Sequence, residues 1–284
     1  MQRITTPFVL LILFLTASSL DAAESGRQIL DRRKALDDGE QHWADRHQQM
    51  RLHIFDANGS ERQRELEMYE KRLANDELKA IVFLRAPAEV RGTAFLAFSH
   101  RGKPADQWLY LPEFKRVRQI TASTRNERFV GTDLTYHELD LLAEMTSWSD
   151  TDAVATLRHE EPVEGVACYA IELDPRREDI GYKRIFLWLG RDDLVPRQVE
   201  FYEQAAGGGW LGGLIGSGTQ VGQLSKRVRQ RDVQLVGNIP VPHTIAVETI
   251  ANGTRTTIEV SGVEFNQNLD DDLFTQRALE RGGK

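Results

Sequence analysis

Apolar and polar positions alternate along most of this chain, in short runs that are separated by turn-forming residues. Alternation with a period of two is typical of strands whose two sides meet different environments. The pattern predicts about thirteen strands, at 48–56, 61–69, 80–85, 93–99, 107–111, 115–120, 154–159, 166–173, 182–189, 195–202, 225–236, 243–250 and 256–265. Their spacing predicts a meandering antiparallel sheet, and the sequence contains no repeated strand–helix–strand unit.

Two Asn-Gly dipeptides and two helical patterns add detail to this sheet. Asn58-Gly59 and Asn252-Gly253 each join two predicted strands, and this dipeptide is a strong hairpin signal. Residues 24–38 predict an N-terminal amphipathic helix. The segment 121–145 interrupts the strands, and Thr132 or Asp133 is expected to cap a short helix there.

The central strands are apolar at every position rather than at alternate ones. Residues 93–98 and 185–189 both show this pattern. A sheet with one face in water would alternate, so something must cover both faces of these strands, either another layer or a bound apolar ligand. A curved sheet that closes over an apolar interior explains both these strands and the alternating outer ones.

Composition describes a folded protein and excludes several function classes. The 284 residues are 40% hydrophobic and 28% charged, with a net charge of −7. This acidic balance argues against a general nucleic-acid binder. The single cysteine, Cys168, excludes an internal disulfide and a cysteine-only zinc site.

The N-terminus predicts export. Arg3 precedes the unbroken apolar run 8–15, and small residues follow up to Ala23. This is the pattern of a secretory signal peptide at 1–23, with cleavage after Ala22 or Ala23. The apolar run is shorter than the roughly 20 residues of a transmembrane helix. An uncleaved anchor is the alternative.

Four stretches carry a resemblance to a known family. They are 87–96 (PAEVRGTAFL), 108–112 (WLYLP), 115–120 (KRVRQI) and 129–136 (FVGTDLTY). In order and spacing the chain resembles the outer-membrane lipoprotein-sorting proteins, or LolA-like periplasmic carriers, in the branch found with exporters of the resistance-nodulation-division type. The resemblance implies a mainly β fold, a curved and incomplete antiparallel barrel with a short helical lid over a hydrophobic cavity for acyl chains. Residues 24–284 would form this single domain.

The resemblance also implies a set of cavity residues. The candidates are Phe95, Trp108, Tyr110, Phe129, Tyr136, Phe186 and Trp188. Aromatic residues at alternate strand positions point to one face, and apolar ligand pockets are lined in this way. Ordinary core packing is the alternative for each of them.

Basic residues are the candidates for contact with a headgroup or a partner. Arg91 follows Pro87 and precedes Gly92, so a turn with local pairing is the alternative for it. Arg116 and Arg118 belong to a basic segment that also holds Arg125 and Arg128. Arginine suits phosphate or carboxylate recognition, so this segment is a candidate for contact with anionic lipid headgroups. A solvated strand face is the alternative.

The sequence holds little that indicates catalysis or metal binding. Asp133, Tyr136, His137 and Glu138 are close in sequence, but Asp133 is better explained as a cap or as a partner of an arginine. His42 and His47 lack metal-ligand spacing. Cys168 lies in an apolar strand and is most simply a small buried residue. Neither a cofactor nor an enzymatic activity is expected.

A glycine-rich insertion at 204–225 departs from the family pattern. It has eight glycines and no charge over 22 residues, and it lacks a phosphate-loop motif. Trp210, Leu211, Leu214 and Ile215 are its large apolar residues. They favour contact with a membrane or a partner, and a hairpin tip that folds back on the barrel is the alternative.

These observations predict a monomeric, non-enzymatic carrier in the periplasm. It would bury lipoprotein acyl chains or another lipid and move them between an inner-membrane exporter and an outer-membrane acceptor. An envelope-stress sensor that binds a lipidated or membrane partner is the alternative. A lipid hydrolase would need a nucleophile, a base and an oxyanion site that the sequence does not assemble.

Overall fold

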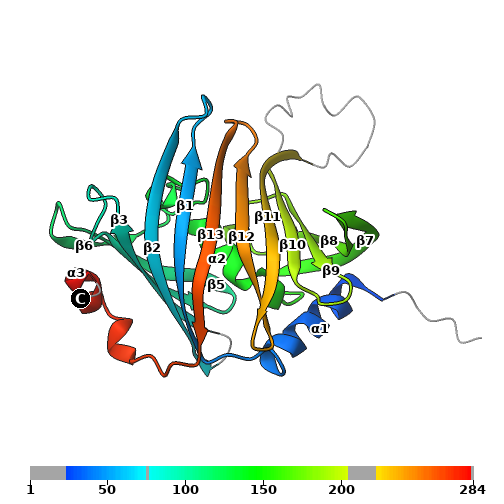
Figure 1. The fold of residues 1–284 in the computed structure, drawn as a ribbon. Helices are drawn as coiled ribbons and strands as arrows, with labels where there is room; N and C mark the ends of the chain where they lie inside the picture. The colour runs from blue at the N-terminus through cyan, green and yellow to red at the C-terminus, as the bar shows by residue number, and fades with distance from the viewer. Residues whose placement is uncertain (1–23, 75–76, 204–221, 283–284) are drawn as a thin grey trace, which may run out of the picture.

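The computed structural model describes residues 24–74, 77–203 and 222–282 (Figure 1). The expected signal peptide at 1–23 lies outside the described residues. So do residues 204–221 of the glycine-rich insertion, with Trp210, Leu211, Leu214 and Ile215. The predictions made for these two segments therefore stay predictions.

Within the described residues, thirteen strands form one antiparallel sheet (Figure 1). The strands are β1 (Asp45–Phe55), β2 (Glu61–Arg72), β3 (Leu78–Ala86), β4 (Ala94–His100), β5 (Lys103–Leu111), β6 (Arg116–Ile120), β7 (Ala153–Val163), β8 (Val166–Pro175), β9 (Arg184–Gly190), β10 (Pro196–Glu203), β11 (Gln223–Val236), β12 (Ile239–Thr249) and β13 (Thr254–Phe265). Two meanders, β1–β6 and β7–β13, join through the pairing of β1 with β13. Strands β6 and β7 form the two edges, so the sheet is an incomplete barrel, as predicted.

Both Asn-Gly hairpins are confirmed. The Asp56 carboxylate accepts hydrogen bonds from the main-chain N–H groups of Asn58 and Ser60, at 2.9 Å each, and Gly59 adopts a φ of +84°. At the second hairpin Thr249 pairs with Thr254. Glycine reaches a positive φ without steric cost, so both turns follow directly from the sequence.

The N-terminal helix and the short helix of the interrupting segment are also confirmed. Helix α1 (Gly26–Asp38) begins at Ser25, whose side chain forms a capping box with Gln28. The interrupting segment contains η2 (Phe129–Gly131), α2 (Tyr136–Glu144) and η3 (Met145–Ser147). The expected cap was wrong by a few residues, because Thr135 caps α2 and forms a capping box with Glu138.

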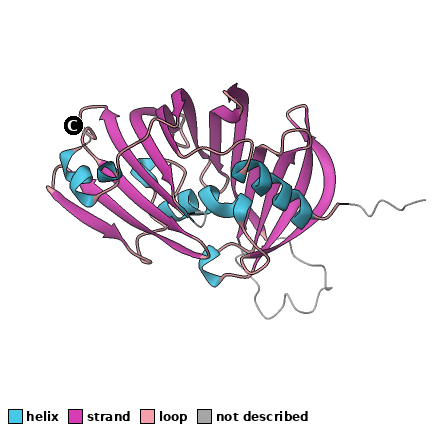
Figure 2. Cartoon of the chain, turned by 90° about the horizontal axis from the view of Figure 1, so that it is seen from below, coloured by secondary structure: helices cyan, strands magenta, loops and turns pink. Residues whose placement is uncertain are grey.

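The sheet arches over α1 and the interrupting segment, which lie on its inner face (Figure 2). The inner face of the sheet is the one that packs against α2. Two apolar clusters fill the space between the layers. One joins α1, α2 and η3 to strands β7–β12, and the other joins the start of the interrupting segment to β1–β6 and to β12–β13. This is the apolar interior that the sequence predicted.

A C-terminal segment that the sequence analysis did not predict covers part of the outer face. It contains η6 (Asp271–Leu273) and α3 (Gln276–Arg281). Phe274 and Leu279 pack against Ile81, Phe83 and Leu96 of β3 and β4. Strands β3 and β4 are therefore apolar on both sides because another layer covers each face, which is the first of the two explanations that the sequence left open for residues 93–98.

Candidate functional site

The segment between β6 and β7 closes over the inner face, and we call residues 121–147 the lid. Its chain reverses at Val130 and Gly131, which have φ values of +42° and +82°. The reversal brings the Phe129 N–H within 2.8 Å of the Leu134 carbonyl oxygen. The lid then enters α2 through the capping box at Thr135. Local turn and capping chemistry thus places two aromatic residues, Phe129 and Tyr136, on the same side.

Phe129 and Tyr136 form an aromatic cluster with Phe95 of β4. The ring centroids of Phe95 lie 5.3 Å from Phe129 and 5.4 Å from Tyr136, and those of Phe129 and Tyr136 lie 5.8 Å apart. None of the three side chains is more than 6% exposed. Burial raises the pKa of Tyr136 to about 12, so the phenol is neutral. The lid therefore presents an apolar side to the inner face of the sheet.

The other four aromatic candidates lie elsewhere, so the seven residues do not line one cavity. Trp108 and Tyr110 face outward, in the cluster under the C-terminal segment. Phe186 and Trp188 also face outward, beside Cys168, and the Trp188 indole N–H donates to Glu161 at 2.7 Å. Alternate positions share a face within one strand, but the pattern does not tell which face is the inner one.

The three basic candidates are spread over two places. Arg91 lies in the turn between β3 and β4 and donates to the main-chain oxygen of Arg85 at 3.0 Å, while Gly92 adopts a φ of +85°. Arg118 forms an ion pair with Glu127 at 3.2 Å, and Arg116 is exposed on β6. The local geometry of Arg91 matches the alternative given above, a turn in which Arg91 pairs locally. Headgroup or partner contact by the three stays a prediction.

Asp133 fixes the lid to the hairpin of β12 and β13. Its buried carboxylate accepts hydrogen bonds from the hydroxyls of Thr249, Thr254 and Thr256, and its N–H donates to Thr256 at 3.0 Å. Arg128 lies 3.7 Å from the same carboxylate. Asp133 is thus a structural anchor, not a helix cap, and pairing with an arginine was correctly expected.

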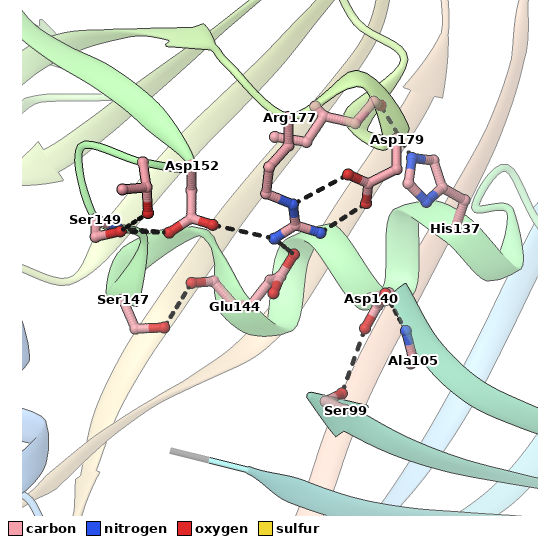
Figure 3. A network of polar contacts seen from close by, with 12 residues as sticks. Ser99, Ala105, His137, Asp140, Glu144, Ser147, Ser149, Asp152, Arg177 and Asp179 are labelled. Carbon is pink, nitrogen blue, oxygen red and sulfur yellow. Dashed lines mark hydrogen bonds and ion pairs between the residues drawn. The ribbon is translucent and has the colours of Figure 1, made fainter. Parts of the chain in front are cut away.

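A buried polar network, which sequence reasoning missed, ties α2 to the segment after β8 (Figure 3). The guanidinium of Arg177 contacts Glu144 at 3.2 Å, Asp152 at 3.4 Å and Asp179 at 2.7 Å. Burial raises the pKa of Glu144 to about 7, with a contribution from Asp140, while Arg177 opposes the shift. Glu144 therefore titrates near neutral pH.

Two further residues on the same helix extend these ties. Asp140 accepts from the main-chain N–H of Ala105 at 2.9 Å, and burial raises its pKa. The His137 ring bonds the main-chain oxygen of Ile180 at 2.9 Å, and burial lowers its pKa, so the ring is neutral and donates (Figure 3). The signal in the sequence was the spacing of 137, 140 and 144, which puts three polar side chains on one face of a buried helix.

The described residues contain no group of three or more His, Cys, Asp or Glu side chains that could hold a metal ion. Across the same residues, no helix is long and apolar enough to span a membrane.

Known proteins share this sequence family and this architecture. A family model described as an uncharacterized protein matches residues 76–207 and 218–281. A domain described as an outer membrane lipoprotein-sorting protein, from Vibrio parahaemolyticus, is 26% identical with a TM-score of 0.75, over 90% of this chain and 98% of that one. No protein with a curated description matches.

Two other crystal structures share the fold. A DUF1329 family protein from Desulfovibrio piger has a TM-score of 0.76 and 23% identity, over 89% of this chain and 97% of that one. A LolA superfamily protein from Nitrosomonas europaea has a TM-score of 0.63 and 18% identity, over 90% and 100%. The chain therefore belongs to the family that this model describes as an uncharacterized protein, and it shares its fold with the LolA-like outer-membrane lipoprotein-sorting proteins.

Proposed function

We propose that this protein is a non-enzymatic periplasmic carrier of lipoprotein acyl chains or of another lipid. The observation that carries the proposal is the lid, whose aromatic side rests on the apolar inner face of an incomplete barrel. Phe95, Phe129 and Tyr136 are the contact between the two layers. An acyl chain that enters between lid and sheet would make apolar contacts in place of those that the two layers lose. Opening the lid for a lipid therefore costs less free energy than opening it to water.

The energetics of burial suit a carrier. Each methylene removed from water contributes about 0.8 kcal/mol, so a chain of about sixteen carbons supplies roughly 13 kcal/mol in favour of the bound state. Closing the lid without cargo recovers the contacts of the aromatic cluster. This competition between lid and cargo would weaken binding enough for delivery to an acceptor. We propose an inner-membrane exporter of the resistance-nodulation-division type as the donor side and the outer membrane as the destination.

The test is lipid binding by the purified full chain. Lipids extracted from the protein are identified by mass spectrometry, and the affinity for a fluorescent N-palmitoyl peptide is measured. We expect acyl lipid at close to one molecule per chain, without turnover. A protein that carries no lipid and fails to bind the palmitoyl peptide would contradict the proposal, and specific capture of a signalling partner by such a protein would favour the stress sensor.

A matched pair of variants tests the inner face. Phe95→Ser should weaken binding of the palmitoyl peptide about tenfold or more, because burial of a phenylalanine contributes about 1.5–3 kcal/mol. Trp188→Leu is the control, because its indole lies on the outer face beside Glu161. Equal losses of affinity in the two variants would mean that binding does not depend on the inner face.

A further inference from the structure

A polar pocket lies beside the lid, at the ends of the strands β10–β13. Its volume is about 380 Å³, which falls within the usual range of small-molecule sites. The walls come from the lid, from the start of α2, from the turn before β9, and from strands and turns of β10–β13. The residues that matter for its charge are Arg125, Arg128, Glu138, Glu203 and Lys226.

The carboxylate at the base of this pocket is already satisfied. Glu138 accepts from the Lys226 ammonium at 2.6 Å, from the Tyr182 hydroxyl and from the Thr135 N–H at 2.7 Å. The side chains of Glu138 and Lys226 are 2% and 7% exposed, so their charges are buried together. The charges of Glu138 and Lys226 cancel each other. Any net charge in the pocket must therefore come from the other residues of its walls.

Two guanidinium groups supply that charge. Arg125 donates to the main-chain oxygen of Asp179 at 3.0 Å, and Arg128 donates to the Thr254 hydroxyl at 3.2 Å. Within the described ranges each guanidinium makes one hydrogen bond, so most of its five N–H donors are available to a ligand. Arg128 is balanced in part by Asp133, at 3.7 Å, while Arg125 forms no ion pair within those ranges.

Two further features of the pocket act on an anion in opposite directions. Glu203, the other acid among the described residues of the wall, accepts from the neutral Ser225 hydroxyl at 2.7 Å, and its carboxylate opposes an anion. The first turn of α2 borders the pocket, so the positive end of the helix dipole lies near it. The first N–H groups of α2 already have acceptors; the N–H of His137, for example, donates to the Arg125 carbonyl oxygen. The helix therefore contributes its electrostatic field to the pocket, but no hydrogen bond to a ligand.

We propose that this pocket binds a phosphate group, with Arg125 and Arg128 as its ligands. Two arginines with fixed positions give the paired N–H donors that phosphate oxygens accept. The same lid places its aromatic side on the inner face and its arginines in the pocket. If the protein carries lipid as proposed above, this phosphate is the headgroup of a lipid whose acyl chain lies under the lid. This identification of the ligand therefore rests on the proposed function. A free phosphate compound shares the same chemistry.

The first experiment uses inorganic phosphate and the full chain. Titration followed by NMR or calorimetry should show saturable binding that the double variant Arg125→Gln/Arg128→Gln weakens about tenfold or more, as expected when charge-assisted hydrogen bonds are lost. Arg62→Gln is the control, since it changes an exposed charge on β2 outside the pocket. Equal phosphate binding by the double variant and the wild type would overturn the proposal, as would the same loss in the control.

The second experiment separates the headgroup from the acyl chain. Short-chain phosphatidylglycerol and the matching uncharged diacylglycerol are compared in the same variants. We expect the double variant to bind phosphatidylglycerol about tenfold more weakly and diacylglycerol as the wild type does. Diacylglycerol binding alone would support the carrier and refute the phosphate site. Binding of inorganic phosphate without either lipid would support the site as one for a free phosphate compound and refute the carrier.

Discussion

Each buried charge of the lid contacts a group that fixes its position. Glu144 differs from the others in its energetics, because burial holds its pKa at about 7, against an ordinary value of 4.5. Between these two values Glu144 binds its proton more tightly in the folded protein than in the unfolded chain. Its contribution to the free energy of unfolding therefore falls as the pH rises through this window.

Glu144→Gln should remove this pH dependence. We expect the wild type to lose roughly 3 kcal/mol more of its unfolding free energy between pH 5 and pH 8 than the variant does, since one pKa unit corresponds to about 1.4 kcal/mol. Urea unfolding at both pH values measures the difference. Glu113→Gln, at an exposed acid, is the control. Parallel pH profiles for wild type and Glu144→Gln would show that Glu144 is charged in the folded protein across the range.

At the scale of single residues, the sequence predicted which residues are buried aromatics better than it predicted the face of the sheet on which each one lies. Phe95, Phe129 and Tyr136 meet as expected, whereas Trp108 and Trp188 face outward. The reason is physical: a strand that is apolar on both sides carries no polar position to mark its outer face. Asp133 was assigned to capping because its partners, three threonine hydroxyls, lie more than a hundred residues away in sequence.

Elements with local signals were predictable, and those defined by distant contacts were not. The hairpins followed from Asn-Gly turns and the N-terminal helix from its periodicity. Helix α3 has six residues, too few for a hydrophobic period, and its place depends on β3 and β4. The position of the C-terminal segment therefore depends on its packing against the sheet. A substitution at Phe274, its largest apolar residue, tests this packing.

Phe274→Ala should destabilise the protein by about 3–5 kcal/mol, because it removes a fully buried ring from the outer layer. The side chain is 2% exposed. Phe114, at 62% exposure, provides the control variant Phe114→Ala, whose effect should stay below about 0.5 kcal/mol. Denaturant unfolding gives both values. A loss below about 1 kcal/mol for Phe274→Ala would mean that the segment contributes little to the fold.

For the whole molecule, the sequence correctly predicted one curved, incomplete antiparallel barrel with a helical lid. It could not place the polar pocket, because the pocket walls come from segments that are adjacent only after folding. The glycine-rich insertion joins β10 to β11 at this end of the sheet. Glu203 and Gln223 pair directly across these strands, so a much shorter turn can join them.

Replacing residues 205–222 by Asn-Gly should leave the melting temperature within a few degrees, since shortening a loop changes its closure entropy only slightly. The same variant should associate less with liposomes or with the exporter, because it lacks Trp210, Leu211, Leu214 and Ile215. Calorimetry and liposome flotation measure the two effects. A variant that no longer folds would identify the insertion as a structural element, and unchanged flotation would refute the membrane contact.

The pairing of β1 with β13 has a consequence for how the chain reaches this structure. Gln49 pairs with Ser261 and Phe55 with Arg255, so the central ladder joins strands that are about two hundred residues apart in sequence. During synthesis each meander can form through local hairpins, but β1 keeps an unpaired edge until the last strand is available. Contacts of such long sequence separation fold slowly. The nascent chain therefore stays incompletely folded until nearly all of it has been made.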